Sequence, residues 1–414
     1  MWVRMHHLFN SYKGVIVFSG LKYLEIVITA LTTFFLAQMI GPFEMGKAIP
    51  VLLYITYSTY LSLGVNQVII KNYSEFEVVD NADVFLNINL QYHVLISLIT
   101  IALAFLFIQY EFALLAGAIS AATIMRSYFM AYFRVIDKIF ILNRNNLIFS
   151  ILLLTSVFTL VETWFDYLLW WAISIWISVI IYIFDSRALL KQLIYKYFFS
   201  KLDFDQIGFI IKQGVRLALL GATTTFLLTF DRIIISNTDL PLDVMGTYQL
   251  ADYFGKAFYM IATTVLFYYY PVILKRLKTE IPFRKKYLKM IIRLMILIVP
   301  IILIFMILVK CIKIFYFKEY PNLEWFVSFN LLLKMIVFIS SLLAAVFIAL
   351  NKEYSFLRTN IPIVIGVLLT IGYSVFLNLK ELKPISIMIL VLLLITLAYQ
   401  IYSTKKIINL DFKN

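Results

Sequence analysis

Cysteine, histidine and known catalytic motifs are scarce or missing in this sequence, and each shortage excludes a class of protein. The single cysteine, Cys311, excludes an internal disulfide, and three histidines without clustered partners predict no metal site. The nucleotide-binding motif G-x-x-x-x-G-K-[ST] is missing, so ATP is not expected to be the direct energy source. The motifs G-x-S-x-G and H-E-x-x-H are missing too, and we therefore predict neither an enzyme nor a bound cofactor.

Charge is also sparse: 14% of the 414 residues are charged, 63% are hydrophobic, and the mean hydropathy is +0.92. Soluble domains are only about half apolar. Apolar runs of about 20 residues recur along the chain and match a bilayer core of roughly 30 Å. The first run is too long for a signal peptide and lacks a small-x-small cleavage site, so we expect a retained span. The composition predicts an all-α polytopic membrane protein.

Twelve membrane spans are predicted from apolar runs that end at polar clusters. Their ranges are 14–40, 48–70, 84–108, 112–133, 147–161, 164–184, 207–230, 244–270, 290–309, 323–350, 361–379 and 385–402. With the N-terminus inside, the inner segments, Arg126 included, hold 23 Lys and Arg, whereas the outer loops, Arg232 included, hold 7. This positive-inside bias places both termini in the cytoplasm. Membrane topology therefore accounts for most of the net charge of +13, and no nucleic-acid partner is expected.

A short turn occurs twice, as IGPFEMG at 40–46 and as LPLDVMG at 240–246. The two final glycines are 200 residues apart, which suggests a duplicated unit of six helices, although a chance match of two short turns is the alternative. The predicted lobes are 1–203 and 204–414. Because six is even, they would be related by a pseudo-two-fold axis along the membrane normal. A central cavity between the lobes is the expected substrate site.

Charged side chains inside the predicted spans are the candidate functional residues. A charge at a helix centre costs about 2.5 to 3.5 kcal/mol on insertion, so such a residue normally faces a cavity or a partner. Two intrahelical pairs at three- and four-residue spacing, Lys22 with Glu25 and Asp252 with Lys256, could simply neutralise each other. The other interior cations, which have no acid at helical spacing, are Lys212, Arg216 and Lys334. A net-positive interior suits an anionic substrate such as a diphosphate headgroup.

Four segments resemble the polysaccharide exporters of the multidrug/oligosaccharidyl-lipid/polysaccharide superfamily. The segments FDRIIIS at 230–236 and GTYQLA at 246–251 are similar to the family pattern D-R-x-x-[IL] … G-x-Y-x-x-A. The turn at 40–46 looks like the family's L-G-P-x-x-[YF]-G, with Met45 where an aromatic residue is usual. The segment FKEY at 317–320 resembles the outer turn between spans nine and ten. Twelve spans in this length, with both ends inside, are similar to the O-antigen (Wzx-type) flippases.

The resemblance implies movement of an undecaprenyl-diphosphate-linked oligosaccharide from the cytoplasmic to the periplasmic leaflet of a bacterial inner membrane. The implied process is alternating access during O-antigen and lipopolysaccharide biosynthesis, driven by a proton or sodium gradient. The partners would be the lipid-linked oligosaccharide, membrane lipids and other polysaccharide assembly proteins. For the diphosphate we expect Arg216 and Lys256 as ligands, with Lys22, Lys212 and Lys334 contributing to the same field.

Ion coupling requires a titratable group inside the membrane, and Glu25 and Asp252 are the acids deep within the predicted spans. Glu25 is the preferred coupling residue, although a static pair with Lys22 remains open.

Two other functions of the protein stay open as well. A drug/cation antiporter of the same superfamily would be poorly served by a net-positive interior. A polytopic O-antigen polymerase or ligase usually needs a larger outer loop than the dozen residues found here.

Overall fold

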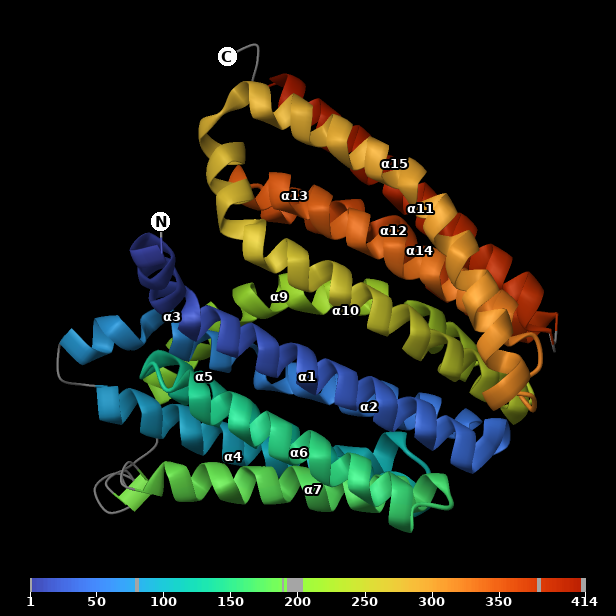
Figure 1. The fold of residues 1–414 in the computed structure, drawn as a ribbon, viewed down its shortest axis with the longest axis horizontal. Helices are drawn as coiled ribbons and strands as arrows, with labels where there is room; N and C mark the ends of the chain where they lie inside the picture. The colour runs from blue at the N-terminus through green and yellow to red at the C-terminus, as the bar shows by residue number, and fades with distance from the viewer. Residues whose placement is uncertain (1, 79–81, 188–189, 192–203, 378–380, 411–414) are drawn as a thin grey trace. The chain divides into compact units, whose positions relative to one another are not determined.

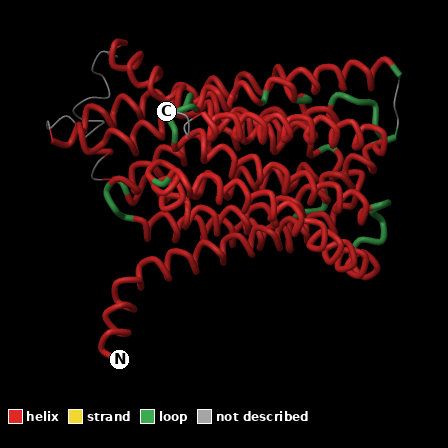
Figure 2. Tube along the Cα trace, turned by 90° about the horizontal axis from the view of Figure 1, so that it is seen from above, coloured by secondary structure: helices red, strands yellow, loops and turns green. Residues whose placement is uncertain are grey.

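The computed structural model describes residues 2–78, 82–187, 190–191, 204–377 and 381–410, and in Figure 2 these are drawn as helices and loops. Figure 1 shows long helices throughout this part of the chain. The helices of the first part are α1 (Trp2–Gly46), α2 (Ala48–Ser58), η1 (Thr59–Ser62), α3 (Val65–Val78), α4 (Ala82–Phe107), α5 (Tyr110–Val135), α6 (Ile139–Leu160) and α7 (Trp164–Asp185). Those of the second part are α9 (Phe204–Ser236), α10 (Leu242–Thr279), α11 (Ile281–Tyr316), α12 (Leu323–Ala349), α13 (Glu353–Thr359), α14 (Ile361–Phe376) and α15 (Leu382–Leu410).

The predicted fold class, an all-α polytopic membrane protein, is confirmed. Within the described ranges, 9 helices are long and apolar enough to cross a membrane, and the count rises to 10 if the bent pair formed by 48–62 and 65–73 is one span. The remaining two of the twelve predicted spans coincide with α9 and α10, which are long helices but are not among these ten. Both carry buried charged residues, and the candidate site lies on them.

The chain divides into two compact units, which we call unit 1 and unit 2. Unit 1 comprises Met1–Met39 and Val51–Leu219, and unit 2 comprises Ile40–Pro50 and Leu220–Asn414. Helix α9 therefore contributes its first part to unit 1 and its second part to unit 2. The assignment of two six-helix lobes at 1–203 and 204–414 stays a prediction.

In unit 1, α4, α5, α6 and α7 pack side by side (Figure 1). Aromatic side chains fill the space between α5 and α7: the ring of Tyr182 stacks on Phe129 at 6.0 Å and on Phe133 at 5.7 Å. Such ring pairs stabilise a core beyond the effect of area burial alone. In unit 2, α10 packs against α12.

The two copies of the repeated turn contact each other reciprocally within unit 2. A Cβ at Gly46 would lie 2.1 Å from the carbonyl oxygen of Leu242, and a Cβ at Gly246 would lie 1.8 Å from that of Pro42. Both positions therefore require glycine, because any side chain would collide with backbone. A pair of motifs related by a local two-fold axis makes this kind of reciprocal contact. The observation agrees with a duplicated unit.

Candidate functional site

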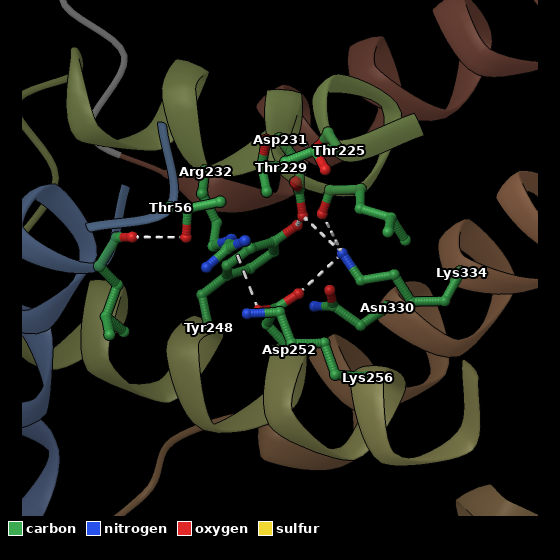
Figure 3. Close-up of polar contacts among 12 residues, drawn as sticks. Thr56, Thr225, Thr229, Asp231, Arg232, Tyr248, Asp252, Lys256, Asn330 and Lys334 are labelled. Carbon is green, nitrogen blue, oxygen red and sulfur yellow. Dashed lines mark hydrogen bonds and ion pairs between the residues drawn. The ribbon is translucent and has the colours of Figure 1, made fainter. Parts of the chain in front are cut away.

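A group of buried charged residues joins three helices of unit 2, and we call it the charge cluster (Figure 3). Its carboxylates and most of its cations are almost completely shielded from solvent. The members are Asp231 and Arg232 near the end of α9, Tyr248, Asp252 and Lys256 on α10, and Lys334 on α12.

Asp252 is at the centre of the charge cluster and meets three cations. Its Oδ1 lies 2.7 Å from Nζ of Lys334, and its Oδ2 lies 2.8 Å from Nζ of Lys256. Nε of Arg232 lies 3.5 Å from the same Oδ2. The Lys256 pair is intrahelical, as the four-residue spacing predicts, but the other two cations come from α9 and α12.

Lys334 connects both carboxylates of the cluster. In addition to Asp252, its Nζ lies 3.7 Å from Oδ2 of Asp231, and it donates a hydrogen bond of 2.7 Å to the backbone oxygen of Leu228. The hydroxyl of Tyr248 donates to the same Asp231 oxygen at 2.7 Å. Lys334 is 0% exposed, so its ammonium group is enclosed by these oxygens.

A glycine on α10 makes this arrangement possible. A Cβ at Gly255 would lie 3.1 Å from Cγ of Lys334 and 3.2 Å from the backbone oxygen of Asn330. The absence of a side chain there allows α12 to approach closely, as small residues do between membrane helices. The stem of Lys334 thus packs against α10 while its ammonium group reaches the carboxylates.

The charges of the cluster largely cancel, because two carboxylates face three cations. At ordinary ionisation the sum is one positive charge. Removing one partner from a buried ion pair costs about 3–5 kcal/mol, since the remaining charge is left uncompensated in a medium of low dielectric constant. The cluster therefore holds α9, α10 and α12 together as well as carrying excess positive charge.

One expectation about these residues is wrong: Arg232 was expected in an outer loop, but it is 1% exposed and lies within α9. Lys334 has no acid at helical spacing on its own helix, as the sequence shows, but it faces Asp231 and Asp252 from other helices. Asp231 itself was missed because it directly follows the predicted span 207–230. Its place in the D-R motif was the signal that marked it.

The remaining predicted site residues do not join the charge cluster. Lys212 is exposed on the part of α9 that belongs to unit 1. The side chains of Lys22 and Arg216 lie outside the described residues. Within the described ranges, no group of three or more His, Cys, Asp or Glu residues could hold a metal ion.

Glu25 belongs to a second polar group, in unit 1, which we call the Arg126 group. Nη2 of Arg126 on α5 donates to Oδ1 of Asn146 on α6 at 2.6 Å, and Nδ2 of Asn146 donates to Oε2 of Glu25 on α1 at 3.3 Å. The guanidinium group also lies 4.6 Å from the centre of the Phe149 ring, within range of a cation–π interaction. Arg126 was expected in an inner segment, but it lies within α5, a candidate membrane span.

This fold is found in known membrane transporters. The chain is similar to lipid II flippase MurJ in an inward closed conformation, with a TM-score of 0.70 and 14% identity over 94% of this chain and 87% of that chain. It is also similar to an inward-facing multidrug resistance MATE family transporter of the MOP superfamily, with a TM-score of 0.64 and 12% identity over 94% of this chain and 96% of that chain.

No protein-family model matches the sequence, and no curated protein matches it significantly. At identities this low, the two likenesses establish the fold. The chain is thus a multi-pass membrane protein with the fold of MOP-superfamily transporters.

Proposed function

We propose that this protein is a flippase for an undecaprenyl-diphosphate-linked oligosaccharide, the O-antigen repeat unit. It moves this lipid from the cytoplasmic to the periplasmic leaflet of the bacterial inner membrane by alternating access. The transporter fold supports this class of function, and the observation that carries the proposal is the excess of positive charge in the charge cluster. A diphosphate is the anionic group that such a substrate presents.

Lys256 is the cluster's candidate ligand for the diphosphate. It is 32% exposed, whereas Lys334 and Arg232 are almost fully buried and engaged with the carboxylates. A phosphate oxygen could therefore reach Lys256 without displacing the two inner cations. We retain Arg216, Lys22 and Lys212 as further cations of the same field on the basis of the sequence. Lys334 acts on the substrate through Asp252 rather than by direct contact.

Glu25 is the candidate coupling residue. Asp252 is surrounded by three cations and is therefore held as a structural anion. Glu25 is half-buried and reaches Arg126 through the neutral amide of Asn146. Anion binding at Arg126 would weaken its attraction for Glu25, so that substrate and proton become linked through this connection.

Drug/cation antiport is the second candidate, because a MATE transporter shares the fold. A positively charged interior would repel cationic drugs, which favours the flippase. Deleting the gene separates the two: a flippase defect leaves lipid-linked oligosaccharide in the cytoplasmic leaflet and removes surface polysaccharide. Normal surface polysaccharide together with increased drug sensitivity would overturn the flippase and support the antiporter.

A further inference from the structure

A polar cavity of about 150 Å³ lies in unit 1, at the break in the bent helix pair 48–62 and 65–73, a candidate membrane span. The chain turns at Leu63, with φ 49°, and at Gly64, with φ 70°, between η1 and α3. A Cβ at Gly64 would lie 2.5 Å from the carbonyl oxygen of Gly214 on α9, so glycine is required there. Non-helical backbone at membrane depth is tolerated where it is buried in protein or lines a cavity, and broken helices often form binding sites.

The cavity is lined by neutral polar side chains. They are the aliphatic hydroxyl residues Thr59, Ser62, Thr123 and Ser127, the phenol Tyr60, and the amides Asn66 and Gln67; Gly64 and Ala218 complete the lining. None of the described residues that line this cavity carries a formal charge. The cavity is therefore poorly suited to the diphosphate itself, which would need cationic partners.

The hydrogen bonds around the cavity show which ligand groups it could accept. Each of the four aliphatic hydroxyls donates its proton to a backbone carbonyl of its own helix segment, at 2.7 to 2.8 Å. Their oxygens can still accept hydrogen bonds, and the amides offer both donors and acceptors. The cavity is far larger than the roughly 10–15 Å³ that a single water molecule needs on the same measure. A ring that carries several hydroxyl groups fits this combination of size, neutrality and hydrogen bonding.

Arg126 lies on α5, the helix that contributes Thr123 and Ser127 to the cavity. Thr123, Arg126 and Ser127 are spaced three and four residues apart on α5 and therefore share one helical face. Arg126 is thus placed to attract a phosphate while its neighbours face the cavity. A sugar that is attached directly to a diphosphate carries its neutral ring beside a negative charge, and along α5 the cavity-lining Ser127 directly follows Arg126.

We propose that this cavity is a sugar subsite, which binds one neutral sugar ring of the lipid-linked substrate beside the diphosphate. The proposal rests on the proposed function and deepens it, because it locates the recognition of the sugar in unit 1. It assigns binding to Thr123 and Gln67 through their polar atoms and not through charge.

The test compares two lipids that differ in the sugar. The first is the lipid-linked oligosaccharide purified from the gene-deletion strain, and the second is undecaprenyl diphosphate without sugar. Binding is measured for the full-length protein in lipid nanodiscs. The variant Thr123→Val/Gln67→Met keeps the side-chain volumes but removes the polar groups, and we expect it to lose about tenfold in affinity for the oligosaccharide lipid. Its affinity for undecaprenyl diphosphate should remain unchanged.

Thr155→Val is the matched control. Thr155 lies on α6 outside the cavity, and its hydroxyl donates to the carbonyl four residues earlier, as that of Thr123 does. This variant should bind both lipids like the original protein. Equal affinity of the double variant and the original protein for the oligosaccharide lipid would overturn the subsite, as would an equal loss of affinity for both lipids. If the deletion strain accumulates no such lipid, the proposed function fails, and the subsite fails with it.

Discussion

In unit 2, five charged side chains pack against one another, whereas in unit 1 seven neutral polar side chains line a cavity. Both regions are expensive inside a membrane, because polar groups lose water there. In the charge cluster, ion pairs within the protein offset the loss of hydration, and four of the five charges are almost fully buried. In the cavity, hydroxyl oxygens that can still accept hydrogen bonds, and the amide groups of Asn66 and Gln67, face a space that a further ligand can enter. The comparison suggests that unit 2 uses its charges mainly for helix packing, with Lys256 as an exception, and that unit 1 recognises the sugar, with Arg126 on α5 attracting the phosphate.

The largest effect should come from the centre of the charge cluster. Asp252→Asn leaves three cations facing a neutral amide, and we expect a loss of about 3–5 kcal/mol in unfolding free energy. The measurement is the thermal unfolding midpoint of the purified protein in detergent, together with its abundance in the membrane.

A charge-balanced variant provides the control. Asp252→Asn/Lys334→Met removes one charge of each sign, so the net charge of the cluster stays at one positive charge instead of rising to two. This double variant should be more stable than Asp252→Asn alone. A stability of Asp252→Asn equal to that of the original protein would show that the cluster does not hold the helices together.

Arg126→Ala should reduce export by about tenfold or more while the protein stays at its normal level, because the cation that adjoins the cavity-lining residues of α5 is lost. Arg126→Lys should retain part of the export, since the charge survives but the planar, two-pronged hydrogen bonding does not. Surface polysaccharide and membrane abundance are measured together. Lys256→Ala and Arg216→Ala provide the comparison with the cations predicted from the sequence. If export stays normal in Arg126→Ala but is lost in Lys256→Ala, Lys256 contacts the diphosphate and Arg126 has no part in binding it.

Glu25→Gln tests whether unit 1 also couples transport to protons. The substitution removes the titratable group but keeps an amide beside Asn146. We expect transport that no longer increases with a pH gradient, measured as substrate-dependent proton flux in proteoliposomes. Transport with the full gradient dependence would make Glu25 structural, and the coupling group would then lie elsewhere in the protein.

The smallest effect should come from an exposed ion pair of unit 2. Arg276 and Glu280 form two hydrogen bonds of 3.0 Å at the end of α10, where solvent screens their attraction. Arg276→Ala should therefore leave both unfolding midpoint and export within experimental error. A loss comparable to that of Asp252→Asn would mean that burial does not explain the importance of the charge cluster.

Apolar runs and local spacing were enough to predict the membrane helices and the pair formed by Asp252 and Lys256. The hydropathy of a span is a property of consecutive residues, and a four-residue spacing places two side chains on one helical face, so neither requires knowledge of the tertiary structure. The repeated turns at 40–46 and 240–246 were also visible in the sequence, together with the glycines that their contact requires.

The partners of Lys334 and Arg126 were decided by tertiary structure alone. Lys334 reaches Asp231 and Asp252 because α9, α10 and α12 pack together, and Arg126 reaches Glu25 through an amide of a third helix. The cavity could not be predicted from the sequence either, because the apolar run at 48–70 predicts a single span and does not indicate a break. Its break at Leu63 and Gly64 is stabilised by the close approach of α9, more than 140 residues further along the chain. Local pattern cannot encode such contacts, because their energy arises only when distant segments meet.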